Sequence, residues 1–388
     1  MQRRDFLKAL AIMSTTTANA QNKKPLLYVG TYSSPAGPEG SHGNGEGIYL
    51  FEMDPATGAL NRRDLFNNDS NPSWLALDRT GTHLYSANEI DAGTVSAYAV
   101  ERATGRLTFL NTVSSEAAGP THLDIHPGGK HVFVANYFGG TSTVLPILDG
   151  GKLGKATDIQ HHKGKVGPVH AATGPGGSFA ISGHEKPHSH MIHSDPSGNY
   201  VLAADLALDL IFIWKFDAHS GKLLPHSQVS VPPGDGPRHF VFHPNGRWMY
   251  SIQEEASTMV VYDYDAAAGH LTPKQTLSTL PKGYGGTNFT SEVRISADGK
   301  FVYGANRLHD SIAWFAVGPD GKLTLTGEEW TRGDYPRSFT IDPSGSYLYS
   351  CNQRSDHITT FRINKQTGAL SFTGQYTPVG TPSIIVFL

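Results

Sequence analysis

Cysteine is nearly absent from this sequence, whose 388 residues contain a single one, Cys351. An internal disulfide is therefore excluded, which fits a chain that folds in a reducing compartment. An excess of charge of one sign is also lacking, because 31 basic residues are balanced by 34 acidic ones. The basic footprint of a nucleic-acid-binding protein is missing, so we expect a small-molecule partner and no nucleic acid.

Long hydrophobic runs are missing as well. Near the N-terminus the apolar stretch 9–13 is short, and it follows the paired arginines Arg3 and Arg4. Small residues before Gln21 offer a cleavage site, so residues 1–20 resemble a twin-arginine export signal. The alternative is a cytosolic tail that contains two arginines by chance. We expect a periplasmic or secreted protein, or a cytoplasmic one if the signal is not used, and no membrane span after residue 20.

What the sequence does contain is a repeat. A unit of roughly 46 to 53 residues recurs from Pro72 to the C-terminus, and one copy is interrupted by a large insertion expected over residues 158–186. Each copy has two apolar runs around a turn such as Asp342–Gly345, an alternating segment such as 358–363, and a short final run. The 43 glycines and 24 prolines fall mostly between these runs, as expected of turns. Four short strands per unit are typical of the blades of a β-propeller.

Six complete copies can be counted, and a seventh begins at Thr381 but ends after one strand. Three unassigned strand-like segments, 26–32, 47–52 and 60–63, lie near the N-terminus. The sequence therefore predicts one all-β domain over residues 21–388. Its fold is a seven-bladed β-propeller of four-stranded blades, and the C-terminal strand joins the N-terminal strands to close the ring.

Alignment of the copies also identifies positions that share one mouth of the ring. The start of each inner strand and the end of the second strand are neighbours in an antiparallel pair. The first set reads Ser73, Thr121, His190, Arg238, Ser291, Arg337 and Ser383. The second set reads Tyr32, Glu89, Tyr137, Leu206, Glu254, Arg307 and Gln353. Because these positions vary among polar, charged and aromatic residues, they indicate a functional site.

Four of these side chains, from three consecutive copies, suit the hydrolysis of an ester-like carbonyl. His190 would activate water, Arg238 or Arg307 would stabilise the developing oxyanion, and Glu254 would orient the histidine or an arginine. The alternative is that Arg238 and Glu254 form a merely structural salt bridge. A serine mechanism is disfavoured, since the serines at the mouth lie outside any Gly-x-Ser-x-Gly motif.

The sequence resembles the seven-bladed propeller lactonases, which include 6-phosphogluconolactonase and carboxy-muconate cycloisomerase. The resemblance covers nearly the whole mature chain and rests on segments 28–32, 135–140, 187–190, 236–239 and 305–312. It implies a carboxylic ester hydrolase that opens a sugar lactone without a metal or other cofactor. It also implies that His190, Arg238, Glu254 and Arg307 are the catalytic residues. One departure is Glu255, which adds a charge beside Glu254.

Four further residues, Glu89, Tyr137, His188 and Arg337, are predicted to line the substrate pocket of a monomeric enzyme. An exported chain is at odds with a phosphorylated, cytosolic substrate, so an unphosphorylated aldonolactone stays open as the substrate. His188, His190 and His193 could instead form part of the metal site of a metal-dependent aldonolactonase. The propeller could also be a non-catalytic module that binds a ligand or another protein.

Overall fold

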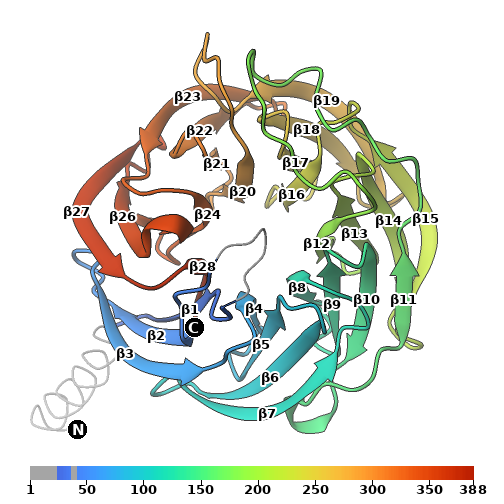
Figure 1. Cartoon of the computed structure of the whole chain (residues 1–388), viewed down its shortest axis with the longest axis vertical. Coiled ribbons are helices and arrows are strands. Elements are labelled where there is room, and N and C mark those ends of the chain that lie inside the picture. The colour runs from blue at the N-terminus through green and yellow to red at the C-terminus, as the bar shows by residue number, and fades with distance from the viewer. Residues whose placement is uncertain (1–23, 36–41) are drawn as a thin grey trace, which may run out of the picture.

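The computed structural model describes residues 24–35 and 42–388, so the predicted export signal lies outside the described residues. Within those two segments the strands form seven four-stranded antiparallel sheets. Figure 1 shows the sheets arranged as blades around a ring. The predicted all-β, seven-bladed propeller is confirmed. No helix in the described segments has the length and apolarity needed to cross a bilayer.

Each blade is numbered by the order of its inner strand along the chain. Blades 1 and 2 comprise β4 (Pro72–Leu77), β5 (His83–Asn88), β6 (Thr94–Glu101), β7 (Arg106–Ser114), β8 (Pro120–Ile125), β9 (His131–Asn136), β10 (Thr141–Pro146) and β11 (Asp158–His161). Blades 3 and 4 comprise β12 (Ser189–Ser194), β13 (Tyr200–Asp205), β14 (Leu210–Asp217), β15 (Lys222–Ser230), β16 (Pro237–Phe242), β17 (Trp248–Gln253), β18 (Thr258–Asp265) and β19 (His270–Ser278).

Blades 5 and 6 comprise β20 (Thr290–Ile295), β21 (Phe301–Asn306), β22 (Ser311–Val317), β23 (Leu323–Trp330), β24 (Pro336–Ile341), β25 (Tyr347–Asn352), β26 (His357–Ile363) and β27 (Leu370–Pro378). Blade 7 comprises β28 (Pro382–Phe387), β1 (Leu26–Thr31), β2 (Gly47–Met53) and β3 (Leu60–Asn67). In the described segments two short 3-10 helices, η2 (Asp149–Gly151) and η3 (Gln353–Ser355), interrupt the loops.

Blade 7 closes the ring in the predicted way. The C-terminal β28 pairs with β1, with Tyr28 opposite Val386 and Val29 opposite Ile385. Ile384 and Ile385 point to opposite faces of β28 and enter the apolar layers shared with blades 1 and 6, respectively. The first and last strands of the ring are therefore covered on both faces, and blade 7 depends on both ends of the chain.

The cores lie between blades, because each sheet buries both faces against its neighbours. Tyrosines on second strands reinforce these contacts. The hydroxyl of Tyr349 in blade 6 donates to the Gly58 carbonyl of blade 7 at 2.9 Å, and that of Tyr85 donates to Gly151 at 3.0 Å. The recurrent tyrosine is thus an apolar filler with a polar end that finds a partner in the next blade.

Every inner strand carries a register shift at its mouth end, which the sequence analysis did not predict. In β16, for example, Pro237 pairs with Gln253 and His239 with Ile252, which leaves Arg238 as the extra residue. The same irregularity recurs in β4, β8, β12, β20, β24 and β28. A bulge redirects a side chain. The bulge residues, such as His190 and Arg238, are the variable inner-strand positions that the sequence analysis identified.

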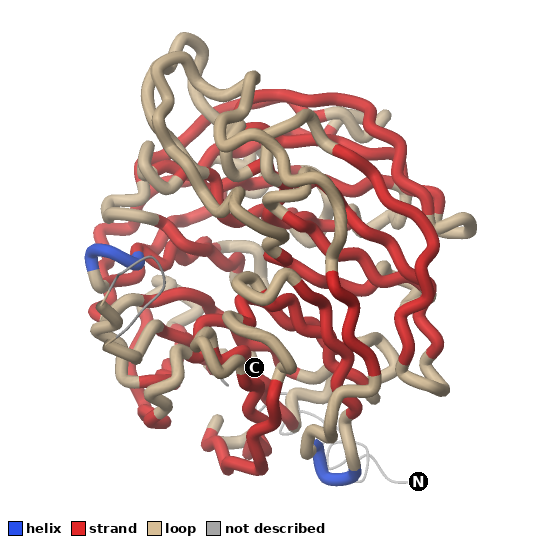
Figure 2. The backbone as a smooth tube through the Cα atoms, turned by 45° about the vertical axis from the view of Figure 1, so that its right-hand side comes forward, coloured by secondary structure: helices blue, strands red, loops and turns tan. Residues whose placement is uncertain are grey.

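The large insertion begins later than the sequence indicated. Residues Asp158–His161, expected to open the insertion, form β11, the outer strand of blade 2, and pair with β10. Their short length and histidine ending concealed the strand. The insertion therefore runs between β11 and β12, and its Gly176 carbonyl accepts from the Gly286 amide of a blade 5 loop at 3.0 Å. Figure 2 shows long loops standing out on one side of the ring.

Candidate active site

Bulges and strand ends bring the four predicted catalytic side chains together at one mouth of the ring. His190 and Arg238 are the bulge residues of β12 and β16, and Glu254 and Arg307 directly follow β17 and β21. All four are almost completely buried, with exposed fractions of 1 to 4 %. The predicted proximity of the two position sets is therefore found in the structure.

The carboxylate of Glu254 binds both arginines. Its Oε2 lies 2.7 Å from Nε of Arg238 and 2.7 Å from Nη2 of Arg307. Further contacts orient the guanidinium groups. Arg238 donates to the Ser291 carbonyl, and Arg307 donates to the Tyr335 hydroxyl at 3.0 Å. The sequence left open whether Glu254 pairs with histidine or arginine, and the geometry selects the arginines.

This triad keeps its charges at neutral pH. Burial alone would raise the pKa of Glu254, but Arg307 and Arg238 outweigh it and lower that pKa. Burial and the neighbouring arginines lower the pKa of Arg238 to about 10, which still leaves it protonated. A buried ion triad is a poor device for stability, because desolvation offsets much of the Coulomb attraction. Its presence in a pocket therefore favours a functional interpretation.

His190 lies beside the triad as a neutral imidazole. Burial, reinforced by the positive charge of Arg238, holds the pKa of His190 well below its usual range. Its ring packs edge-on against Tyr137, with centroids 5.5 Å apart. Its Nδ1 is buried and has no hydrogen-bond partner among the described residues. A neutral ring can accept a proton, as a general base must.

Glu89 provides a second carboxylate at the mouth. Its Oε2 accepts from the hydroxyls of Tyr32 at 2.8 Å and Ser73 at 2.7 Å. Arg337 extends over the Tyr32 ring and places Nη2 3.8 Å from the same oxygen. Glu89 and Arg337, predicted from the repeat to line the site, therefore form one linked pair in the same pocket as Glu254 and Arg307.

One pocket collects most of the predicted residues. Its lining consists of Glu89, Thr121, Tyr137, Phe138, His190, Glu254, Arg307 and Arg337. Arg238 lies deeper, in an adjoining cavity that His190 also lines. His188 is placed behind Tyr137 instead of in the lining, because its ring stacks on that tyrosine at 4.2 Å and its Nδ1 contacts the Tyr137 carbonyl at 2.9 Å.

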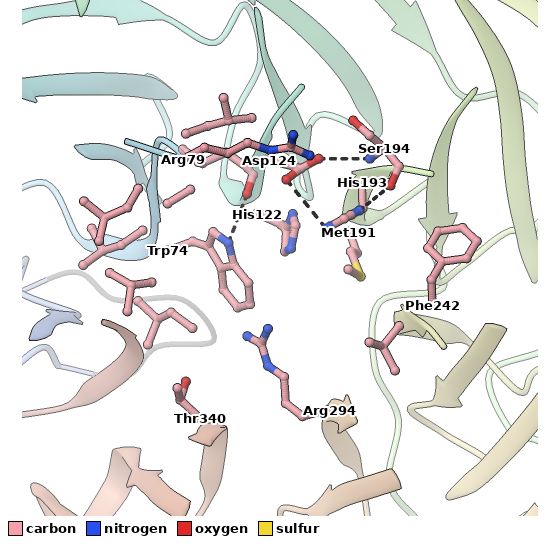
Figure 3. A pocket seen from close by; sticks show the side chains of 18 of the residues that line it. Trp74, Arg79, His122, Asp124, Met191, His193, Ser194, Phe242, Arg294 and Thr340 are labelled. Atoms are coloured by element: carbon pink, nitrogen blue, oxygen red, sulfur yellow. Dashed lines mark hydrogen bonds and ion pairs between the residues drawn. The ribbon is translucent and has the colours of Figure 1, made fainter. Parts of the chain in front are cut away.

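A larger cavity, of about 980 Å³, occupies the opposite end of the central channel. Figure 3 shows His193 there beside Asp124, with Trp74 and Arg294 facing each other across the channel. Nε2 of His193 lies 3.7 Å from Oδ1 of Asp124. His193 is thus separated from the two histidines with which it could have formed a metal site. In the described part of the chain, no group of three or more His, Cys, Asp or Glu side chains is arranged to hold a metal ion.

The sequence analysis missed Phe138, which lines the pocket, and Tyr335, which orients Arg307. A signal for Tyr335 was present. It precedes the inner-strand proline, where other copies have Gly119 or Gly236, and all three adopt a positive φ of 63 to 68°. A tyrosine in this left-handed conformation is strained, and strain of this kind concentrates at functional sites.

Glu255, the departure from the family pattern, links the insertion to the site. Its carboxylate accepts from the backbone amide of Ser182 and lies 3.9 Å from Nδ1 of His184. Burial and, to a smaller extent, the charge of Glu254 raise the pKa of Glu255 to about 7. Neighbouring carboxylates therefore differ sharply, since Glu254 is held ionised by arginines and Glu255 is pushed toward protonation.

We expect Glu255→Gln to change the pH dependence of stability. A carboxyl whose pKa rises on folding stabilises the native state below its unfolded pKa of about 4.5, and this contribution is lost as pH rises through about 7. The variant should therefore be more stable than wild type at pH 8, by up to about 3 kcal/mol, with a smaller difference at pH 5. Urea unfolding at both pH values measures this. An equal difference at pH 5 and pH 8 would contradict the assignment.

The pocket thus combines a proton acceptor, His190, with fixed positive charge from Arg307 and carboxylates that hold the arginines in place. Such a set can activate water and stabilise an oxyanion on an electrophilic carbonyl. It could equally bind a polar ligand that has an acidic group.

Comparisons with known proteins agree with this architecture. The family model described as lactonase, 7-bladed beta-propeller, matches residues 26–387. The 6-phosphogluconolactonase of Bacillus subtilis is 33% identical over 367 residues, which cover 94% of this chain and 99% of that protein. The Pectobacterium carotovorum 6-phosphogluconolactonase is 34% identical over 297 residues, 76% of this chain and 81% of the relative.

Among solved structures, the periplasmic gluconolactonase of Pseudomonas aeruginosa superposes with a TM-score of 0.85 at 28% identity, covering 94% of this chain and 99% of that one. A Lactobacillus plantarum protein gives a TM-score of 0.83 at 29% identity and the same coverage. The match extends over nearly every strand of the ring, from β1 to β28. This chain therefore belongs to the family of seven-bladed β-propeller lactonases.

Proposed function

We propose that this protein hydrolyses an aldono-1,5-lactone by direct attack of water, without a metal ion. The observation that carries the proposal is the placement of a neutral histidine beside a carboxylate that holds two arginines at 2.7 Å. Membership of a lactonase family and relatives named 6-phosphogluconolactonase and gluconolactonase support it.

In the proposed reaction His190 removes a proton from water as the water oxygen bonds to the lactone carbonyl carbon. Arg307, which shares the pocket with His190, stabilises the oxyanion that forms. The tetrahedral intermediate then breaks its bond to the ring oxygen, and that oxygen receives the proton from the imidazolium. The pocket has a volume of about 20 Å³, room for about one water molecule, so the carbonyl would approach from the open mouth.

The roles of the remaining residues follow from their positions. Arg238 would hold Glu254 from below, and Glu254 would fix Arg307 for the carbonyl. Glu89 and Arg337 would bind lactone hydroxyls or an acidic group of the substrate, and Tyr137 would support His190. His188 would act indirectly, by holding Tyr137.

The preferred lactone in this proposal is unphosphorylated. The paired arginines of the N-terminal segment favour export to the periplasm, where phosphorylated sugars are scarce. One structural relative is named a periplasmic gluconolactonase, which supports this choice, whereas the Bacillus relative is named for the phosphorylated substrate.

The test measures hydrolysis of glucono-1,5-lactone and of its 6-phosphate by the mature protein, against spontaneous hydrolysis, with and without a chelator. We expect faster turnover of the unphosphorylated lactone, unchanged by chelator. His190→Gln should lower kcat about 10²- to 10³-fold. The exposed His270 gives a matched His270→Gln control that should keep wild-type rates. Loss with chelator would favour metal-dependent catalysis, and no activity on either lactone would favour a binding propeller.

A further inference from the structure

Next to His190 lies a buried pair that the mechanism above does not use. His239 of β16 and Glu292 of β20 place Nδ1 and Oε1 3.1 Å apart, and the two residues are only 2 % exposed. His239 lines the deeper cavity together with His190, whereas Glu292 lines the large cavity at the other end of the channel. The pair therefore bridges the interior between the two ends.

The hydrogen bond determines where His239 carries its proton. A carboxylate can only accept, so Nδ1 of His239 must donate to Glu292. The charge state agrees: although burial opposes it, Arg294 and the contact with His239 lower the pKa of Glu292 to about 2. Burial lowers the pKa of His239 to about 4, so its ring is neutral. Nε2 of His239 is therefore an acceptor.

The neighbouring ring of His190 also carries a buried nitrogen that has no partner. Nε2 of His239 and Nδ1 of His190 are both buried, and neither has a hydrogen-bond partner in the described structure. The two rings pack at 68° with centroids 5.0 Å apart. Leaving two buried polar nitrogens unpaired costs about 1 to 3 kcal/mol each, and a hydrogen bond between them would satisfy both.

His190 needs such a partner if it acts as a base. Three arginines, Arg238, Arg337 and Arg307, oppose the positive charge that its ring acquires on accepting a proton. A carboxylate acting through a second imidazole offsets that charge, in the same way that a carboxylate stabilises the histidine of a hydrolytic triad. Glu292 is fixed for this purpose by the Val293 amide at 3.0 Å and by Arg294 at 3.4 Å.

We propose that His239 and Glu292 are positioning residues for His190: Glu292 holds the proton of His239 on Nδ1, and His239 accepts Nδ1–H of His190. Nε2 of His190 is then unprotonated and faces the substrate. When Nε2 takes a proton from water, Nδ1–H stays on His190 and its hydrogen bond strengthens. The proton on Nε2 passes to the ring oxygen of the lactone as the C–O bond breaks, which leaves the relay in its starting state.

This inference rests on the proposed function, but its first test does not require activity. Two-dimensional ¹H–¹⁵N spectra of the imidazole nitrogens report the tautomer, and comparison with His190→Gln assigns the His190 signals. We expect the proton on Nδ1 of His190 in wild type. In His239→Phe, which keeps a ring but removes the acceptor, we expect a shift to the Nε2–H tautomer or a mixture. A wild-type proton on Nε2, or an unchanged tautomer in the variant, would overturn the proposal.

The second test is kinetic and has a matched control. His122 is buried in the same cluster, with its ring 5.5 Å from that of His239 and 4.3 Å from that of Trp74. His239→Phe should lower kcat about 10- to 100-fold with KM unchanged, and His122→Phe should change neither. Equal losses in both variants would overturn the positioning role.

Glu292→Gln extends the test if His239→Phe does not fold. It keeps the shape of the side chain and removes the charge, so kcat should fall about 10-fold, and Glu292→Asp should restore part of the loss. An unchanged kcat in Glu292→Gln would overturn the proposal. If wild type hydrolyses no lactone tested, the proposed function fails, and the tautomer measurement still decides this inference.

Discussion

Glu254→Gln is expected to lose both stability and activity. Glu254 is the shared partner of Arg238 and Arg307, and all three are buried. Neutralising the carboxylate leaves two guanidinium groups in the interior without a counter-charge between them. Removal of one partner from a buried ion pair costs about 3 to 5 kcal/mol. We therefore expect the free energy of unfolding at pH 7 to fall by about that amount.

The activity loss has a separate cause. In the proposed mechanism Glu254 orients Arg307, the oxyanion donor, and loss of one such donor costs about 10² to 10³ in rate. We expect kcat/KM to fall about 10²- to 10³-fold in Glu254→Gln, with partial recovery in Glu254→Asp. Urea unfolding and lactone hydrolysis measure the two effects on the same preparation.

Glu255→Gln is the matched control, since it removes the same charge from the adjacent residue. The stability contributions of the two carboxyls depend on pH in opposite directions. The lowered pKa of Glu254 stabilises the fold above about pH 4.5, and this is lost as pH falls through the folded pKa. The raised pKa of Glu255 destabilises it at high pH. At pH 8 one variant should thus be less stable than wild type and the other more stable. Changes of the same sign would show that the two environments were wrongly assigned.

Deletion of residues 382–388 is the second change with a large expected effect. It removes β28 and with it every hydrogen bond that β1 makes on that side. It also removes Ile384 and Ile385, which belong to two different apolar layers. Burial of a large aliphatic side chain contributes about 1.5 to 3 kcal/mol, and a domain is stable by only about 5 to 15 kcal/mol. We expect no cooperative unfolding transition in the truncated chain.

A circular permutant is the control for this deletion, because it keeps β28 and moves only the position of the chain termini. The Leu388 amide donates to the Leu26 carbonyl at 2.8 Å, so a short linker can join residue 388 to Lys24. New termini can be placed between Pro319 and Asp320, in an exposed turn. The permutant should unfold cooperatively and close to wild type, as followed by circular dichroism. A truncated chain that unfolds at the wild-type midpoint would show that β28 does not close the ring.

Most of the fold was predictable because the repeat is local information. Each copy shows its own pattern of strands and turns, as in Pro72–Leu77 and His83–Asn88. A strand that is hard to assign in one copy can therefore be assigned by alignment with the others. The exception was β11, where the copy departs from the pattern and the outer strand was assigned to the insertion. A strand this short has too little alternation to be recognised without its partner.

The candidate site was predictable only as a set of positions. The repeat placed His190, Arg238, Glu254 and Arg307 at one mouth and put Arg238 beside Glu254 within one blade, but it could not pair Glu254 with Arg307, which belongs to the next blade. His193 illustrates the limit. It follows His190 in the same strand, yet it belongs to the cavity at the far end of the channel. Phe138 and Tyr335 entered the site through loop conformations that no periodicity encodes.

By itself the sequence determined the number of blades, the closure of the ring by β28, and the mouth at which polar side chains collect. These three features follow from the spacing of the strands and their order along the chain, and both can be read from one sequence. Tertiary structure alone decided that Glu254 joins two arginines, that Glu255 beside it is pushed toward protonation, and that His239 and Glu292 lie next to His190. Charge state and pairing depend on desolvation and on distances between blades. His239 and Glu292 are 53 positions apart in the chain, and their side chains come to within 3.1 Å only because blades 4 and 5 are packed together in the closed ring.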